Sequence, residues 1–281
     1  MNALEITRLE KHFKDFSLED ITITLPAGCI MGVVGENGAG KSTTIKLIMN
    51  LLHRDAGDVC VLGVPLDTDE NALKEHIGVV MDESSFPENL TAKNIDHIMK
   101  NCYKTWDAKK FAEYLHRFTL PEGKRVKEYS RGMKMKLAIA VALSHDSRLL
   151  ILDEATSGLD PFVREELLDV FLDFIQDETH SIFISSHIVG DLEKICDYIA
   201  FLHKGRLVFC KTKDELMETY ALVECGEAEY ESFDNTAVIG RRKHEFGMQV
   251  LMKRDGLPEG GLWDAPSLED IMIYHVRGVE L

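Results

Sequence analysis

The sequence predicts an α/β fold in which helices cover a mostly parallel central sheet. Apolar segments of strand length alternate along the chain with segments of helical periodicity. Ile30 to Val34 is rich in β-branched residues and is followed by a glycine-rich loop and a helical pattern. Leu149 to Leu152 is a continuous apolar run, which is typical of a parallel strand buried on both faces.

The segments around the glycine-rich loop are predicted to be short strands, some of them in an antiparallel part of the fold. Residues 21–25 alternate apolar and polar side chains, as a half-buried strand does. The predicted strands of this region cover residues 3–6, 21–25, 30–34, 59–64 and 77–81.

A helical subdomain, at about residues 85–145, is predicted to be inserted into this α/β core. Thr91 and Asp107 have the residue types and positions of helix N-caps, each flanked by a pair of apolar residues that can pack together. These pairs are Leu90 with Ile95 and Trp106 with Phe111. The core resumes with the buried strand at Leu149, and its later elements are predicted at 162–175 (helix), 181–185 (strand) and 188–196 (helix).

The character of the sequence changes near Lys213, so we expect a main α/β domain at 1–213 and a small α+β accessory region at 214–281. Within that region, alternating residues 227–231 suggest a strand with an acidic face, paired with 246–252. Ser267 to Asp270 resembles a capping box that opens a last short helix.

Composition excludes several classes of protein. The formal net charge of −16 argues against nucleic acid as the main partner, and the basic cluster at 241–244 is interpreted as a solvated turn. Six scattered cysteines form no C-x-x-C pair, so free thiols in a reducing cytosol are expected rather than a metal or redox motif. The longest uncharged run, 21–35, is broken by proline and glycine and is too short to span a membrane.

Gly35 to Thr43 fits the pattern G-x-x-x-x-G-K-[ST], which wraps the phosphates of a nucleotide. Its glycines let successive backbone N–H groups point at an anion, and the helix that follows adds the positive end of its dipole. Lys41 supplies a positive charge to the phosphates, and the Ser42 hydroxyl can ligate Mg²⁺. The alternative is a glycine-rich turn before a helix. The nucleotide-binding residues predicted here are Asn37, Gly38, Ala39, Gly40, Lys41, Ser42 and Thr43.

A second carboxylate site, Asp153 and Glu154, follows the buried strand that starts at Leu149. The carboxyl end of a parallel strand is where α/β folds bind ligands. Asp153 can hold Mg²⁺ directly or through water, and Glu154 is placed to polarise a water for attack on the γ-phosphate. A solvated strand end is the alternative interpretation.

In their order, these motifs resemble the ATPase subunit of an ABC transporter over about residues 1–212. Leu149–Glu154 resembles Walker B, and Tyr129–Met133 stands where the family has its LSGGQ signature ahead of a helix at 133–143. The remaining resemblances are Gly35–Thr43 to Walker A, Ser157–Asp160 to the D-loop, His187 to the switch histidine and Phe13 to the aromatic residue that stacks on adenine.

The resemblance implies a Mg²⁺-dependent ATP hydrolase in which two cassettes pack head to tail. Each ATP would lie between the Walker A loop of one cassette and the signature of the other, as a homodimer or a heterodimer. Glu154 and His187 would be catalytic. Phe13, Ser130, Gly132 and Asp160 would join the nucleotide-binding residues.

Three departures from the family pattern bear on function. The signature reads YSRGM, so only Ser130 and Gly132 remain from its core. Asp82, followed by Glu83, replaces the Q-loop glutamine; its carboxylate can still hold Mg²⁺ or its water, so the predicted metal ligands are Ser42, Asp82 and Asp153. Phe13 replaces the commoner tyrosine and keeps the π face.

Within the family, the chain most resembles ATPases of small bacterial exporters of peptides, drugs or antibiotics, such as the phenol-soluble-modulin exporters. This implies transmembrane permease subunits as partners, and a cytoplasmic location on the inner face of the cell membrane. Two alternatives remain: a soluble ABC-type ATPase of DNA repair or translation, and a regulatory ATP-binding subunit with weak turnover. Neither the transported molecule nor the choice between homodimer and heterodimer follows from the sequence.

Overall fold

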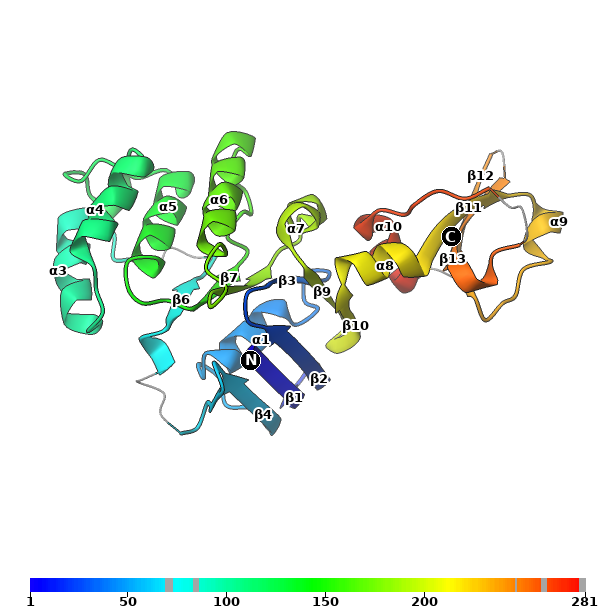
Figure 1. Ribbon diagram of the computed structural model, residues 1–281, viewed down its shortest axis with the longest axis horizontal. Coiled ribbons are helices and arrows are strands. Elements are labelled where there is room, and N and C mark those ends of the chain that lie inside the picture. The colour runs from blue at the N-terminus through cyan, green and yellow to red at the C-terminus, as the bar shows by residue number, and fades with distance from the viewer. Residues whose placement is uncertain (69–72, 83–85, 246, 259–261, 278–281) are drawn as a thin grey trace.

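The computed structural model describes residues 1–68, 73–82, 86–245, 247–258 and 262–277 (Figure 1). Its strands are β1 (Asn2–His12), β2 (Ser17–Pro26), β3 (Ile30–Val34), β4 (Ala56–Val61), β5 (Val64–Pro65), β6 (Ile77–Val80), β7 (Leu149–Asp153), β8 (Ser181–Ser185), β9 (Tyr198–His203), β10 (Arg206–Thr212), β11 (Tyr220–Cys225), β12 (Val238–His244) and β13 (Gly247–Lys253). Its helices are α1 (Lys41–Ile48), α3 (Ala92–Cys102), α4 (Ala108–Arg117), α5 (Arg131–Ala142), α6 (Pro161–Phe174), α7 (Val189–Ile195), α8 (Lys213–Thr219), α9 (Glu227–Tyr230) and α10 (Leu268–Arg277), with 3-10 turns η1 (Val126–Glu128) and η2 (Arg254–Gly256).

Ten strands form one sheet in the order β5-β4-β1-β2-β10-β9-β3-β8-β7-β6. From β6 through β7, β8 and β3 to β9 the neighbours are parallel, whereas β1, β2, β4 and β5 pair antiparallel. The predicted fold class, with a mostly parallel core sheet and an antiparallel part, is therefore confirmed.

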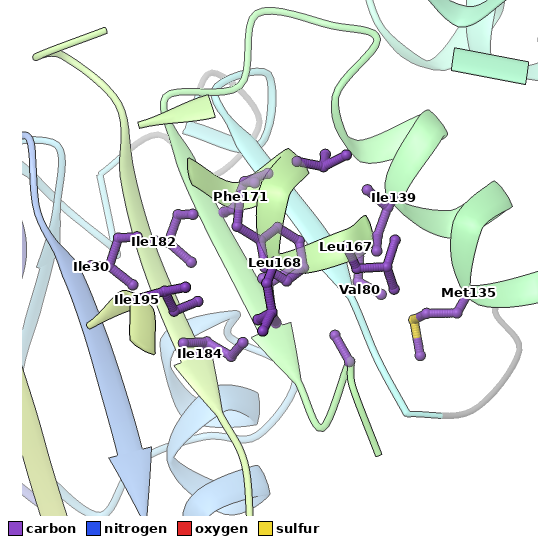
Figure 2. Packing of buried hydrophobic residues seen from close by; sticks show 14 of the residues in the cluster. Ile30, Val80, Met135, Ile139, Leu167, Leu168, Phe171, Ile182, Ile184 and Ile195 are labelled. Carbon is purple, nitrogen blue, oxygen red and sulfur yellow. The ribbon is translucent and has the colours of Figure 1, made fainter. Parts of the chain in front are cut away.

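The parallel strands carry alternating side chains into two separate cores. Leu150 and Leu152 of β7 belong to the core cluster that includes buried residues of α5, α6 and α7. Leu167 and Phe171 of α6 pack in the same cluster (Figure 2). Leu149 and Ile151, one position away on the same strand, pack instead with α1 and the antiparallel strands. Because both faces are covered, the strand is an unbroken apolar run, which explains why the sequence pattern identified it.

The predicted caps of the helical region are present in the structure. Thr91 accepts a hydrogen bond from Asn94 N and forms a capping box at the start of α3. Asp107 caps α4, and the rings of Trp106 and Phe111 pack 5.2 Å apart beside it. Figure 1 shows α3 and α4 at one end of the molecule and the small C-terminal sheet at the other.

Two predictions for the C-terminal region are wrong. Residues 227–230 form the short helix α9 rather than a strand. No side chain of α9 is buried, so the alternation of acidic and apolar residues there does not mark a buried strand face. The strand lies earlier, at β11, where Ala221, Val223 and Cys225 are buried. The basic residues 241–244 belong to β12 rather than to a turn; residues 242–244 are exposed, and β12 lies at the edge of its sheet.

The predicted strand at 246–252 does exist as β13, which pairs with both β11 and β12; Phe246 lies outside the described residues. Ser267 and Asp270 exchange hydrogen bonds at the start of α10, as the capping pattern predicted. Leu268, Ile271 and Tyr274 of α10 pack into the same core cluster as the main sheet. The boundaries at 213/214 and at about 85 and 145 remain predictions; residue 85 lies outside the described residues.

Candidate functional site

The glycine-rich loop joins the buried end of β3 to the start of α1. Gly40 is the N-cap of α1, with φ at 111°, a conformation that favours glycine. A Cβ atom at this position would lie 2.6 Å from Leu18 Cδ1 and 3.2 Å from Phe16 Cζ. Gly40 is therefore needed both for its backbone angle and for the close approach of Leu18 and Phe16, and the loop N–H groups lie next to a helix N-terminus.

Lys41 is a buried cation whose ammonium is held by the loop itself. The side chain is 6% exposed, and its Nζ donates to Gly35 O at 2.8 Å and to Glu36 O at 3.4 Å. Glu154 Oε1 lies 3.5 Å from the same Nζ. The ammonium thus sits between the loop carbonyls and one carboxylate, at the place where incoming phosphate oxygens would meet it.

Asp153 lies at the carboxyl edge of the parallel sheet and is fixed by two hydroxyls. The register places it opposite Ser185 of β8, and Ser185 is also opposite Val33 of β3, so three strand ends meet here. Asp153 Oδ1 accepts hydrogen bonds from Ser42 Oγ at 3.0 Å and from Ser185 Oγ at 2.6 Å. The predicted pair of metal ligands, Ser42 and Asp153, is therefore in direct contact.

Glu154 lies directly after β7 and is joined to His187. The Nδ1 atom of His187 is 2.6 Å from Glu154 Oε2, and His187 N donates to the same oxygen at 3.3 Å. Because an ionised carboxylate only accepts hydrogen bonds, the imidazole donates from Nδ1 and keeps Nε2 for another group. Glu154 is 14% exposed at its side chain and His187 is 49% exposed, so the histidine faces the solvent side of the pair.

Lys41, Ser42, Glu154 and His187 line one cavity of about 580 Å³. Its walls bring together the predicted loop residues, Glu154, His187 and Asp82 with residues that the sequence analysis had not assigned to the site. The lining residues are Phe16, Glu36, Asn37, Gly38, Ala39, Gly40, Lys41, Ser42, Thr43, Asp82, Glu154, Ser157 and His187.

Ser130, Gly132 and Asp160 do not line this cavity. Ser130 is the N-cap of α5 and accepts a hydrogen bond from Met133 N, and Gly132 lies in the first turn of that helix. Asp160 caps α6 by accepting from Phe162 N and Val163 N at 3.1 Å each. These three residues lie at the N-termini of α5 and α6 rather than in the loop that holds Lys41.

Asp82 has a partner that the sequence did not suggest. Its Oδ1 accepts a hydrogen bond from Arg131 Nη2 at 2.8 Å, so the carboxylate that follows β6 is bound to the first residue of α5. Glu83 lies outside the described residues. A role of Asp82 as a Mg²⁺ ligand remains a prediction.

Phe13 lies beside the cavity rather than in its wall. Its side chain is 44% exposed, and its ring centroid is 6.2 Å from that of Phe16, which does line the cavity. The two rings follow each other in the turn between β1 and β2, so Phe16 extends an apolar surface from the loop toward Phe13. Sequence reasoning missed Phe16 because nothing in its pattern distinguished it from a core residue.

Among the residues that the structure describes, no helix combines the length and the apolar character needed to cross a bilayer.

Comparison with known proteins identifies the family. Residues 18–157 match the family described as ABC transporter. The chain is 30% identical over 207 residues to the ABC transporter ATP-binding protein YtrB of Bacillus subtilis, spanning 74% of this chain and 70% of that protein. It is 31% identical over 214 residues to the lantibiotic transport ATP-binding protein SrtF of Streptococcus pyogenes, spanning 75% and 91% of the two chains. A solved structure of an ATP binding subunit of an ABC transporter matches with a TM-score of 0.70 at 28% identity, over 76% of this chain and 91% of that one.

Proposed function

This chain belongs to the family of ABC transporter ATP-binding proteins, and we propose that it hydrolyses ATP with Mg²⁺ to power a bacterial exporter of peptides or drugs. One observation carries the proposal. Glu154 lies between Lys41 of the phosphate loop and His187, in the same cavity as the loop itself.

Binding of ATP rests on the loop and on α1. The phosphates take the place next to Lys41, whose Nζ then exchanges Gly35 O and Glu154 for phosphate oxygens. The N-terminus of α1 and the backbone N–H groups of residues 37–43 add fixed positive charge. Phe13, supported by Phe16, offers its π face to the adenine.

The residues present fit Mg²⁺, which prefers oxygen ligands and keeps several waters of its own. Ser42 Oγ and Asp153 Oδ1 are already 3.0 Å apart, and both would hold the ion with phosphate oxygens completing its shell. The bound ion supplies positive charge that offsets the charge on the β- and γ-phosphates.

Hydrolysis is assigned to Glu154 and His187. Glu154 accepts the proton of the attacking water, and its freedom to do so increases when the phosphates draw Lys41 away. The hydrogen bond from His187 Nδ1 orients the carboxylate, and His187 Nε2 remains for an oxygen of the γ-phosphate.

Two copies are needed for a complete site, because the starts of α5 and α6 lie outside the cavity that holds Lys41. Ser130 and Gly132 would reach the ATP of a second cassette, and Asp160 would lie at the same contact. Support comes from Phe162, which is 87% exposed in the first turn of α6. Burial of this aromatic side chain by a partner would stabilise the dimer.

The export role and the permease partner rest on relatives. SrtF is a lantibiotic transport protein, which favours a peptide-like cargo for this chain, and transmembrane permease subunits would hold it at the inner face of the membrane. The helices between β6 and β7 are the proposed contact with those subunits.

Phosphate release by the purified full-length chain, alone and with candidate permeases, tests this function. We expect Mg²⁺-dependent turnover, together with loss of ATP affinity in Lys41→Ala because a buried cation is removed from the phosphates. ATP binding without turnover would instead favour the regulatory alternative. Recovery of the chain with soluble repair or translation complexes rather than a membrane permease would contradict the export role.

A further inference from the structure

Two of the positions that depart from the family pattern contact each other. Asp82 stands where the family has glutamine, and Arg131 stands where LSGGQ has its first glycine. Their side chains form an ion pair with a distance of 2.8 Å between Arg131 Nη2 and Asp82 Oδ1. The inference below rests on the proposed ATPase function and concerns how the same site is held together.

The pair links the wall of the nucleotide cavity to the signature helix. Asp82 lines the cavity, two residues after the last residue of β6. Arg131 is the first residue of α5 and follows Ser130, which caps that helix. A single ion pair therefore connects the cavity wall to the residue next to Ser130.

The guanidinium of Arg131 also lies against the loop after β7. A Cβ atom added to Gly158 would be 2.8 Å from Arg131 Nη1 and 3.0 Å from Cζ. Gly158 has φ at 65° and follows Ser157, which lines the cavity. The absence of a side chain at Gly158 is thus what allows Arg131 to lie between the loop and Asp82.

We propose that Asp82 and Arg131 are a positioning pair, which fixes the Ser130 end of α5 relative to the nucleotide cavity and to the Ser157–Gly158 loop. The side chains are 49% and 53% exposed, so the pair adds little to global stability, and its effect is on the geometry of the assembled site.

A double-mutant cycle in the full-length chain tests the pair. Asp82→Asn and Arg131→Gln should each lower kcat for ATP hydrolysis by about fivefold, with the KM for ATP and the melting temperature unchanged. The double variant should lose no more than either single variant, because both remove the same contact. Arg131→Lys should recover part of the rate. The double variant Asp82→Gln/Arg131→Gly should have a higher kcat than Asp82→Gln alone or Arg131→Gly alone.

A matched control is the ion pair of Arg117 with Asp173, which has a similar distance of 2.6 Å and side-chain exposures of 42% and 63%. Arg117→Gln and Asp173→Asn should leave kcat unchanged, since this pair lies outside the cavity lining.

If the wild type hydrolyses ATP, three outcomes would overturn the inference. The single variants could have the kcat of the wild type, or their losses of kcat could multiply to about 25-fold in the double variant. The third outcome is a fall in melting temperature large enough to account for the loss of kcat. A fourth is a changed Mg²⁺ requirement in Asp82→Asn that Arg131→Gln does not share, which would make Asp82 a metal ligand. A wild-type chain without any ATP turnover would instead refute the proposed function itself.

Discussion

Glu154 has a backbone conformation that few residues with a Cβ atom adopt, with φ at 53°. Residues held in the left-handed region cost free energy and persist where the surroundings fix them. Here Glu154 N donates to Ser185 O and Ser185 Oγ at 3.1 Å each, and the carboxylate is held by His187. The strained turn aims the side chain at the cavity rather than along the sheet.

Glu154→Gln should keep ATP binding but lower turnover by at least about 100-fold, because the amide cannot accept the proton from water. The shape of the side chain is retained, so a dimer with trapped ATP should accumulate on size exclusion. A turnover near that of the wild type would show that another group is the base. Glu36→Gln is a control, since Glu36 lines the cavity but its carboxylate is not placed at the attacking water in the proposed mechanism.

Phe13→Ala should weaken ATP affinity by roughly tenfold, since stacking of a base on an aromatic ring contributes about 1–3 kcal/mol. Phe13→Tyr should bind ATP as well as the wild type, because the π face is kept. Titration with a fluorescent ATP analogue measures both. If Phe13→Ala binds normally and Phe16→Ala alone does not, the stacking ring is Phe16, which lines the cavity.

At the level of elements, the sequence predicted best where both faces of a strand are buried. The strand at 181–185 was predicted to the residue and that at Leu149 to within one, because short apolar runs there mark strands buried on both faces. The acidic segment at 227–231 was misread since alternation over five residues fits a short exposed helix as well as a strand. Tyr220 to Cys225, with only one charged residue, carried the true signal.

The sequence predicted the motifs that line the candidate site but not the side-chain contacts that join these motifs to one another. The loop at 35–43, Asp153, Glu154 and His187 come together as the sequence suggested. Ser185 and Arg131 were missed because a serine at a strand end and an arginine on a helix are common at solvated positions, and Phe16 was missed because its pattern is that of a core residue. Their roles depend on strand register and on the packing of α5, which the sequence shows only indirectly.

At the start of α5, the role of Ser130 as a helix cap can be tested separately from its proposed role in binding an anion. Ser130→Asp keeps an N-cap, because aspartate accepts the hydrogen bond from Met133 N about as well as serine does. The added negative charge should repel the γ-phosphate of the second cassette. We expect an unchanged melting temperature and normal ATP binding by one chain, with loss of ATP-driven dimerisation in light scattering.

Ser130→Thr, a cap without added charge, is the control and should still dimerise. A mixture of Ser130→Asp with Lys41→Ala should retain at most one competent site per dimer. Full activity of that mixture would contradict the arrangement in which the signature acts on the partner's ATP.

Across the whole molecule, His275 helps to join the C-terminal region to the main sheet. It lies on α10, and its ring packs edge-on against Phe209 of β10 and Tyr220 of β11 at 5.4 and 5.3 Å. Its Nε2 is 3.3 Å from Tyr220 Oη, and its Nδ1 donates to Ile271 O at 2.7 Å. Burial lowers the pKa of His275, so the folded protein holds this ring neutral where an unfolded chain would protonate it.

The sign of the pH effect follows from that lowered pKa. When the pH falls through about 6.5, the unfolded state takes up a proton that the folded state resists, so the free energy of unfolding decreases. Lys211 lowers the pKa further, and His145, whose pKa is also lowered by burial, contributes in the same direction.

The melting temperature should therefore fall between about pH 8 and about pH 6, and His275→Phe should make this dependence shallower. Phenylalanine keeps a ring among Phe209 and Tyr220 but cannot take up a proton, so the part of the slope that remains is assigned to His145 and other groups. His97→Phe on the exposed side of α3 is the matched control and should keep the wild-type slope. Melting curves with equal slopes for the wild type and His275→Phe would show that protonation of His275 does not oppose folding.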